Sequence, residues 1–153
     1  MTATNHAVFG ALTVAVISNP VIGLPLALLS HFALDSLPHF GAHTIAEPGS
    51  REFNSILIFD ITLGICVILV VGLAGSRTGY PWWLLPVGAI LGMIPDLMWL
   101  KHYRNDIHGE EKHWDKVRHV HKKIQNWELS WGWIIEIIWY VATVGILSQV
   151  LFA

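Results

Sequence analysis

Five apolar stretches, separated by shorter polar segments, dominate the pattern of hydrophobic and polar positions in this chain. They cover residues 7–18, 21–37, 55–75, 82–100 and 131–152. A helix needs about 20 apolar residues to cross a bilayer, and the last three stretches reach or approach that length. The pattern therefore predicts an all-α fold. We expect a polytopic membrane bundle of about five hydrophobic helices, with residues 1–153 forming one domain.

Asn19-Pro20 separates the first two stretches, each of which is shorter than a perpendicular membrane span. An Asn-Pro pair favours turn initiation, and proline suits the first turn of a helix. We therefore expect a tight hairpin of two short helices. The alternative is a single long span over residues 7–37. Only the hairpin places His6 at the same membrane face as His31 and Asp35.

Basic residues gather in the polar segment between the fourth and fifth stretches. Of the nine Lys and Arg, seven lie there: Lys101, Arg104, Lys112, Lys116, Arg118, Lys122 and Lys123. The positive-inside rule places this segment in the cytoplasm. Helical projection of residues 110–127 predicts an additional amphipathic cytoplasmic helix. In that projection His121 falls on the apolar side, while His119 points away from it.

The composition agrees with a membrane protein. The chain is 54% hydrophobic and 13% charged, whereas soluble domains have about 25% charged residues. The bilayer is thus the expected partner, and a formal net charge of -2 does not indicate a nucleic-acid binder. The single cysteine, Cys66, lies in an apolar stretch, so no cysteine-based metal site is expected.

Ionisable residues occur near one end of each apolar stretch, and in the hairpin topology these ends all lie at the cytoplasmic face. A charged group inside hydrocarbon costs roughly 2.5 kcal/mol or more, so such residues are usually paired or functional. Their convergence at one face indicates a common site. In chain order they are His6, His31, Asp35, Asp60, Asp96 and Glu136.

The sharpest local signal is the spacing of His31 and Asp35, which lie four residues apart on one helical face. Such a pair can offer a nitrogen and an oxygen to one cation, or it can be a hydrogen-bonded pair without metal. Pro38 is expected to end the helix and leave His39 free to turn toward the same point. Asp96 follows a proline that interrupts its helix, which suits a ligand. The predicted ligands of a zinc-type divalent metal are His6, His31, Asp35 and Asp96, completed by His39 or His121.

Asp60 and Glu136 lie several residues inside their apolar stretches. In a hydrolase they are the candidate catalytic groups, either orienting the ligands or accepting a proton. In a transport protein the same carboxylates, with Asp96, would relay protons or cations.

The element Ser30-His31-x-x-x-Asp35, with His6 before it and Pro95-Asp96 after it, resembles elements of the bacterial inner-membrane-associated metal-dependent hydrolases. In that family the Ser-His-x-x-x-Asp element follows the Pro-Asp element, whereas here it precedes it. His31-x-x-x-Asp35 followed by His39 is also distantly similar to the zinc-binding stretch of zinc-dependent phospholipases C. The resemblance implies an inner-membrane protein whose zinc-type site hydrolyses a phosphodiester or another ester, with lipids among the candidate substrates.

The sequence leaves two classes of function open. One is the metal-dependent hydrolase, in which a metal-activated water attacks the ester at the cytoplasmic membrane face. The other is a non-enzymatic module for ion or proton transport, or for binding a metal or a haem held between His6 and His31. Tightly bound zinc would favour the first class, and ion flux in liposomes the second.

Overall fold

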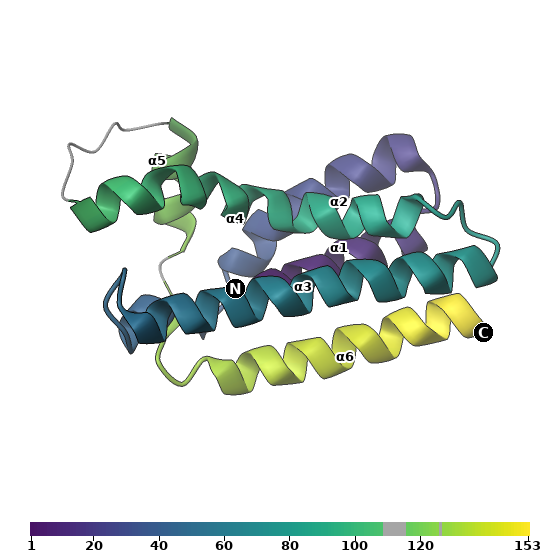
Figure 1. The fold of residues 1–153 in the computed structure, drawn as a ribbon. Coiled ribbons are helices and arrows are strands. Elements are labelled where there is room, and N and C mark those ends of the chain that lie inside the picture. Colours follow the sequence, from purple (N-terminus) through teal and green to yellow (C-terminus); the bar gives the residue numbers. More distant parts are fainter. Residues whose placement is uncertain (109–115, 126) are drawn as a thin grey trace.

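The computed structural model describes residues 1–108, 116–125 and 127–153, and it is mainly helical (Figure 1). This confirms the all-α class. Two short strands, β1 (His39–Phe40) and β2 (Glu128–Leu129), pair in parallel, and a 3-10 turn, η1, covers Ala42–Thr44. The helices are α1 (Ala3–Val16), α2 (Pro20–Asp35), α3 (Arg51–Arg77), α4 (Leu84–His108), α5 (Lys116–Ile124) and α6 (Trp133–Phe152).

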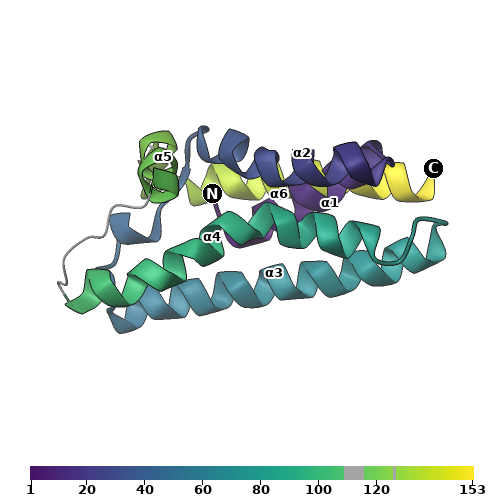
Figure 2. The same ribbon diagram turned by 90° about the horizontal axis from the view of Figure 1, so that it is seen from above.

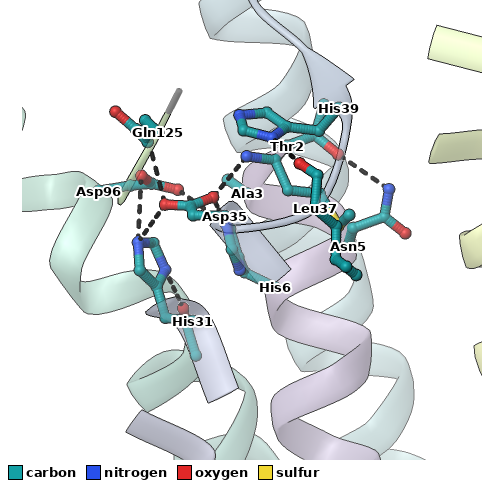
Figure 3. A network of polar contacts seen from close by, with 12 residues as sticks. Thr2, Ala3, Asn5, His6, His31, Asp35, Leu37, His39, Asp96 and Gln125 are labelled. Atoms are coloured by element: carbon teal, nitrogen blue, oxygen red, sulfur yellow. Dashed lines mark hydrogen bonds and ion pairs between the residues drawn. The ribbon is translucent and has the colours of Figure 1, made fainter. Parts of the chain in front are cut away.

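The first two helices form the predicted hairpin. The side chain of Asn19 accepts a hydrogen bond of 3.0 Å from the N–H of Val21, and Pro20 occupies the first turn of α2. The turn brings the end of α2 back beside the start of α1, so His6, His31 and Asp35 lie close together (Figure 3). A single span over residues 7–37 is thereby excluded.

Helix α1 is the central element of the fold and contacts α2, α3, α4 and α6. It carries apolar or small residues on all sides, which is typical of a buried helix. Its core residues pack with others from the beginning of α4: Ala7, Ala11, Val14, Leu84, Leu85 and Ala89.

Small residues allow α1 and α4 to pack unusually closely. A Cβ atom added to Gly92 would lie 2.3 Å from the backbone oxygen of His6, and one added to Gly10 would lie 2.3 Å from that of Gly88. No larger side chain fits at such distances. The Gly88-x-x-x-Gly92 spacing is a known signal for close helix packing. The sequence-based predictions did not use this glycine spacing, because they rested on ionisable residues.

Only two helices in the described residues, α3 and α6, are long and apolar enough to cross a membrane. The expectation of about five such helices therefore needs correction. Helix α1 has 14 residues and α2 has 16. At about 1.5 Å per residue both are shorter than the roughly 30 Å hydrocarbon core. The apolar part of α4 covers only Leu84–Leu97.

The outer surfaces of α3 and α6 are apolar and exposed. In the most apolar window of each helix, 17% of the residues of α3 and 22% of those of α6 are buried inside the protein. Core helices of water-soluble proteins are mostly buried, so these two helices differ from them. They run lengthwise along the bundle with α1, α2 and α4 (Figures 1 and 2).

Helices α3 and α4 extend beyond the apolar stretches into the polar segments. Helix α3 starts at Arg51, because the Ser50 side chain caps it by accepting a hydrogen bond from the N–H of Phe53. Helix α4 continues past its apolar part to His108. Of the amphipathic helix expected over 110–127, the structure shows α5, Lys116–Ile124, while residues 110–115 and 126 lie outside the described residues. Helix α5 packs across the end of the bundle at which α1 begins (Figures 1 and 2).

Candidate metal centre

Four side chains from three helices converge at the end of the bundle where α1 begins (Figure 3). We call them the four-residue cluster: His6, His31, Asp35 and Asp96. Each offers one ligand atom, and these atoms all lie within 4.8 Å of one another. His6 comes from the beginning of α1, His31 and Asp35 from the end of α2, and Asp96 from the proline-interrupted part of α4. Four of the six predicted ligands thus form the cluster, and a fifth, His121, contacts it.

Asp35 is the centre of this cluster, and its side chain is 0% exposed. Its Oδ1 atom lies 3.0 Å from Nε2 of His6 and 2.5 Å from the amino group of Met1. Its Oδ2 atom lies 3.1 Å from Nε2 of His31. The two oxygens of one buried carboxylate are therefore surrounded by nitrogen atoms from separate parts of the chain.

Helix α5 and the residue that follows it supply two further polar groups to Asp35. Nε2 of His121 lies 2.7 Å from Oδ2 of Asp35, and Gln125 donates a hydrogen bond of 3.2 Å to the same oxygen. The projected orientation of this helix agrees with the structure, because His119 is exposed while His121 reaches the cluster. Gln125 was not predicted from the sequence. Its spacing of four residues from His121, on the same helical face, was the available signal.

The hydrogen bond made by His31 indicates which of its two ring nitrogens directs a lone pair into the cluster. Nδ1 of His31 lies 2.8 Å from the carbonyl oxygen of Gly92. A carbonyl only accepts, so Nδ1 carries the hydrogen and Nε2 is unprotonated in the neutral ring. This arrangement, in which the second nitrogen donates to a backbone carbonyl, is usual for metal-binding histidines.

Several nitrogen atoms crowd around the Asp35 carboxylate, and the amino group of Met1 is a positive charge among them. Nε2 of His31 and Nε2 of His121 lie 3.1 Å apart, and both face Oδ2 of Asp35. Lone pairs at these distances repel one another unless a proton or a metal cation lies between them. A hydrogen on one of the two imidazoles satisfies this contact, and a metal cation would also do so.

Asp96 lies near both imidazoles of the cluster without a direct hydrogen bond to either. Its carboxylate oxygens lie 3.6 Å from Nε2 of His31 and 3.8 Å from Nε2 of His6, which is too long for hydrogen bonding. Neighbouring ligand atoms around tetrahedral zinc are roughly 3.4 Å apart, given bonds of about 2.0–2.2 Å. The four imidazole–carboxylate separations, from 3.0 to 3.8 Å, lie around that value, and all ligand atoms of the cluster lie within 4.8 Å of one another.

His39 does not belong to the four-residue cluster. Its Nδ1 atom lies 2.7 Å from the carbonyl oxygen of Leu37, as Figure 3 shows. Burial lowers the pKa of His39 below its usual value, and the nearby amino group of Met1 lowers it further. His39 is therefore a buried neutral imidazole beside the cluster.

Asp60 caps the first turn of α1 from a neighbouring helix. Its carboxylate accepts hydrogen bonds from the backbone N–H of Ala3 at 2.7 Å and of Thr4 at 3.0 Å. The hydroxyl of Thr4 donates a third, at 2.7 Å. These N–H groups have no partner within α1, so Asp60 satisfies them as a capping residue does.

Glu136 holds the same end of α1 from the other side. One of its carboxylate oxygens accepts the N–H of Thr2 at 3.0 Å and the side-chain amide of Asn5 at 2.9 Å. The other accepts the N–H of Phe40 at 3.0 Å. The two residues expected to be catalytic thus bind the start of α1 and β1, and neither is a member of the four-residue cluster.

Comparison with known proteins gives no further assignment. No protein-family model, no curated protein and no solved structure matches this chain.

Proposed function

We propose that this protein binds a divalent metal ion, with zinc as the first candidate, through the four-residue cluster and His121. The observation that carries the proposal is the convergence of two imidazoles and two carboxylates within 4.8 Å of one another. Nitrogen and oxygen donors in this ratio suit zinc and related first-row metals. The close packing of α1 on α4 supports it further, because it fixes His6 opposite Asp96.

We further propose that the metal centre hydrolyses a phosphodiester or another ester, with lipids among the substrates. A bound zinc ion would supply the nucleophile by lowering the pKa of water to about 7. The side chains of His6, His31 and Asp35 are 0% exposed, whereas that of Asp96 is 28% exposed and that of His121 is 13% exposed. A substrate would therefore approach between α4 and α5, where Gln125 offers an amide donor.

In this proposal Asp60 and Glu136 position α1 and take no part in proton transfer. Their oxygens already accept hydrogen bonds from the backbone of Thr2, Ala3 and Thr4. Because His6 follows directly on this turn, the two carboxylates fix the place of its imidazole. The same hydrogen bonds argue against the transport alternative, in which these residues would exchange protons.

Haem binding between His6 and His31 is disfavoured by their geometry. Their rings are stacked with centroids 3.9 Å apart and planes inclined by 25°. A porphyrin ligated by two histidines lies between their rings, and the stacked pair leaves no room for it.

We place the protein in a membrane, with the bacterial inner membrane as the proposed location. Helices α3 and α6 would span it, and the three shorter apolar helices would complete a polytopic bundle between them. The support is the apolar, outward-facing surface of α3 and α6 together with the basic segment that follows the apolar part of α4.

The metal proposal is tested by elemental analysis of the full chain purified in detergent. We expect zinc that survives dialysis, and hydrolysis of bis(p-nitrophenyl) phosphate that chelator removes and added zinc restores. Zinc binding without hydrolysis would restrict the function to metal binding. Ion flux in liposomes without bound zinc would favour the transport class.

His121→Ala is expected to reduce zinc content and hydrolysis much more than His119→Ala. His121 lies 2.7 Å from Asp35, whereas His119 is exposed on the same short helix. Zinc per chain and the rate of phosphodiester hydrolysis are the measurements. Equal losses in the two variants would show that α5 does not supply a ligand.

Asp60→Ala is expected to lower the free energy of unfolding by about 1–2 kcal/mol, because it removes a helix cap. Asp60→Asn keeps an acceptor oxygen and should lose less. Thermal unfolding of both variants is measured next to their zinc content and hydrolysis rate. If both variants lost hydrolysis while stability and zinc content stayed normal, Asp60 would be a proton-transfer group after all.

A further inference from the structure

Exposed tryptophans mark the two ends of the helical bundle. In the described part of the chain, five of them fall into two groups, which we call the first and the second tryptophan group: Trp127, Trp131 and Trp133, and then Trp82 and Trp83. The hydroxyl of Tyr80 donates a hydrogen bond of 3.0 Å to the carbonyl oxygen of Ala15, which places the second group near the end of α1. Tryptophan is enriched at both interfaces between a membrane and water. The two groups therefore mark the two boundaries of the bilayer proposed above.

The spacing of the two tryptophan groups fits the thickness of a hydrocarbon core. Helix α6 begins beside the first group, and its 20 residues correspond to about 30 Å of helix. Its other end lies at the same end of the bundle as the turn between α3 and α4, which carries the second group (Figures 1 and 2). The hydrocarbon core of a bilayer is also about 30 Å thick. One boundary of the core thus lies at each tryptophan group.

The four-residue cluster lies close to the boundary at the first tryptophan group. Glu136 accepts hydrogen bonds from Thr2 and Asn5, so the first turn of α1 is level with the first turn of α6. Glu136 follows Trp133 by about 4.5 Å along the helix axis, and His6 follows Asn5 directly. Each headgroup layer of a bilayer is roughly 5–8 Å thick. The cluster is therefore at a depth that a lipid headgroup reaches, and far from the bilayer midplane, where transport proteins bind their substrates.

Exposed apolar side chains border the opening of the cluster. Asp96 and His121 are the partly exposed groups there, between α4 and α5. Leu97 follows Asp96 in α4 and is exposed. Val120 precedes His121 in α5 and is exposed as well. A phospholipid offers a charged phosphodiester next to apolar acyl chains, so its two parts match the two kinds of side chain at the opening.

On the basis of the hydrolase function proposed above, we propose that the cluster opens into the headgroup layer of one leaflet and that its substrate is a phospholipid of that leaflet. The diester carries a negative charge, which suits a site for a divalent cation. On hydrolysis the oxygen of a water molecule bonds to phosphorus, one P–O ester bond breaks, and a proton of that water goes to the departing alcohol oxygen. The acyl chains lie beside the apolar side chains at the opening.

Spin labelling of the full chain in lipid vesicles tests the depth of the opening. Nitroxide labels are attached to Val120→Cys and to Trp82→Cys in a Cys66→Ala background, and to the native Cys66, which is exposed near the middle of α3. The relative accessibility to dissolved oxygen and to a water-soluble nickel chelate reports the depth of each label. We expect the first two labels at headgroup depth and the label on Cys66 near the bilayer centre. A label on Val120→Cys that lies at the bilayer centre, or in bulk water, would overturn the proposal.

The substrate class is tested with the zinc-loaded full chain in vesicles of phosphatidylethanolamine and phosphatidylglycerol. At equal diester concentration, we expect phospholipid hydrolysis to be at least tenfold faster than that of glycerophosphoethanolamine, which has the same diester without acyl chains. Val120→Ser should lower the phospholipid rate at least threefold and leave the rate with bis(p-nitrophenyl) phosphate unchanged. Val21→Ser is the matched control, because Val21 is exposed at the start of α2, at the opposite end of the bundle, and it should change neither rate.

The outcomes separate the phospholipid assignment from the hydrolase function on which it depends. Bound zinc and hydrolysis of bis(p-nitrophenyl) phosphate, without hydrolysis of phospholipid, would overturn the assignment and leave the hydrolase function standing. Equal rates with phospholipid and glycerophosphoethanolamine would have the same meaning. Bound zinc without hydrolysis of any diester would overturn both.

Discussion

Replacing Asp35 with asparagine is expected to abolish tight zinc binding at the four-residue cluster while leaving the helices folded. Asparagine is nearly isosteric, but it lacks the negative charge that balances a cation. Changes outside the first ligand shell already cost 10–100-fold in metal affinity. We therefore expect the loss of this central ligand to weaken zinc binding by more than about 100-fold.

The effect of chelator on thermal stability distinguishes a metal centre from a metal-free ionic cluster. A ligand present at about 100 times its dissociation constant stabilises the folded state by about 2.7 kcal/mol. Chelator should therefore lower the melting temperature of the wild type and leave that of Asp35→Asn unchanged. In a metal-free cluster, the variant would be destabilised because His6, His31 and Met1 lose their charged partner, and chelator would have no effect on either protein.

The decisive measurement is zinc per chain together with thermal unfolding, with and without chelator, for the wild type and Asp35→Asn. Asp35→Glu is a useful companion variant, because it keeps the charge and moves the oxygens. If the wild type holds no metal and its melting is insensitive to chelator, the hydrolase proposal has to be abandoned.

Replacing Gly92 with alanine is expected to disrupt the metal centre through the backbone, without removing any ligand. The new methyl group would lie 2.3 Å from the backbone oxygen of His6. Helix α1 must then move away from α4, which separates His6 from Asp96. Overpacking of this kind costs about 1–3 kcal/mol, and we expect zinc affinity to fall at least tenfold.

Gly145 provides the matched control on α6. A Cβ atom added there meets nothing within 4 Å. Gly145→Ala should therefore be neutral, or stabilising by up to about 1 kcal/mol through helix propensity. Melting temperature and zinc affinity are compared for the two variants. If Gly92→Ala behaved like Gly145→Ala, the close contact between α1 and α4 would not be what positions the cluster.

Local sequence patterns were sufficient to predict the structural features that depend only on residues close together in the chain. The apolar stretches predicted helices, and Asn19-Pro20 predicted the turn between the first two. The spacing of His31 and Asp35 placed both side chains on one face, and helical projection distinguished His121 from His119. Each of these follows from helix periodicity or turn chemistry within a few residues.

The sequence predicted that these helix ends lie at one face, but only the tertiary structure showed which side chains contact one another there. Asp60 and Glu136 are catalytic candidates by their place within apolar stretches, and the structure shows that their carboxylates accept hydrogen bonds from backbone N–H groups 57 and 134 residues away in the chain. His6 and Asp96 join Asp35 because Gly10, Gly88 and Gly92 let α1 approach α4 closely. Periodicity defines which residues share a face of a single helix. Close packing of α1 on α4 depends instead on the absence of side-chain atoms at glycine, and a search for charged and polar residues does not detect that absence.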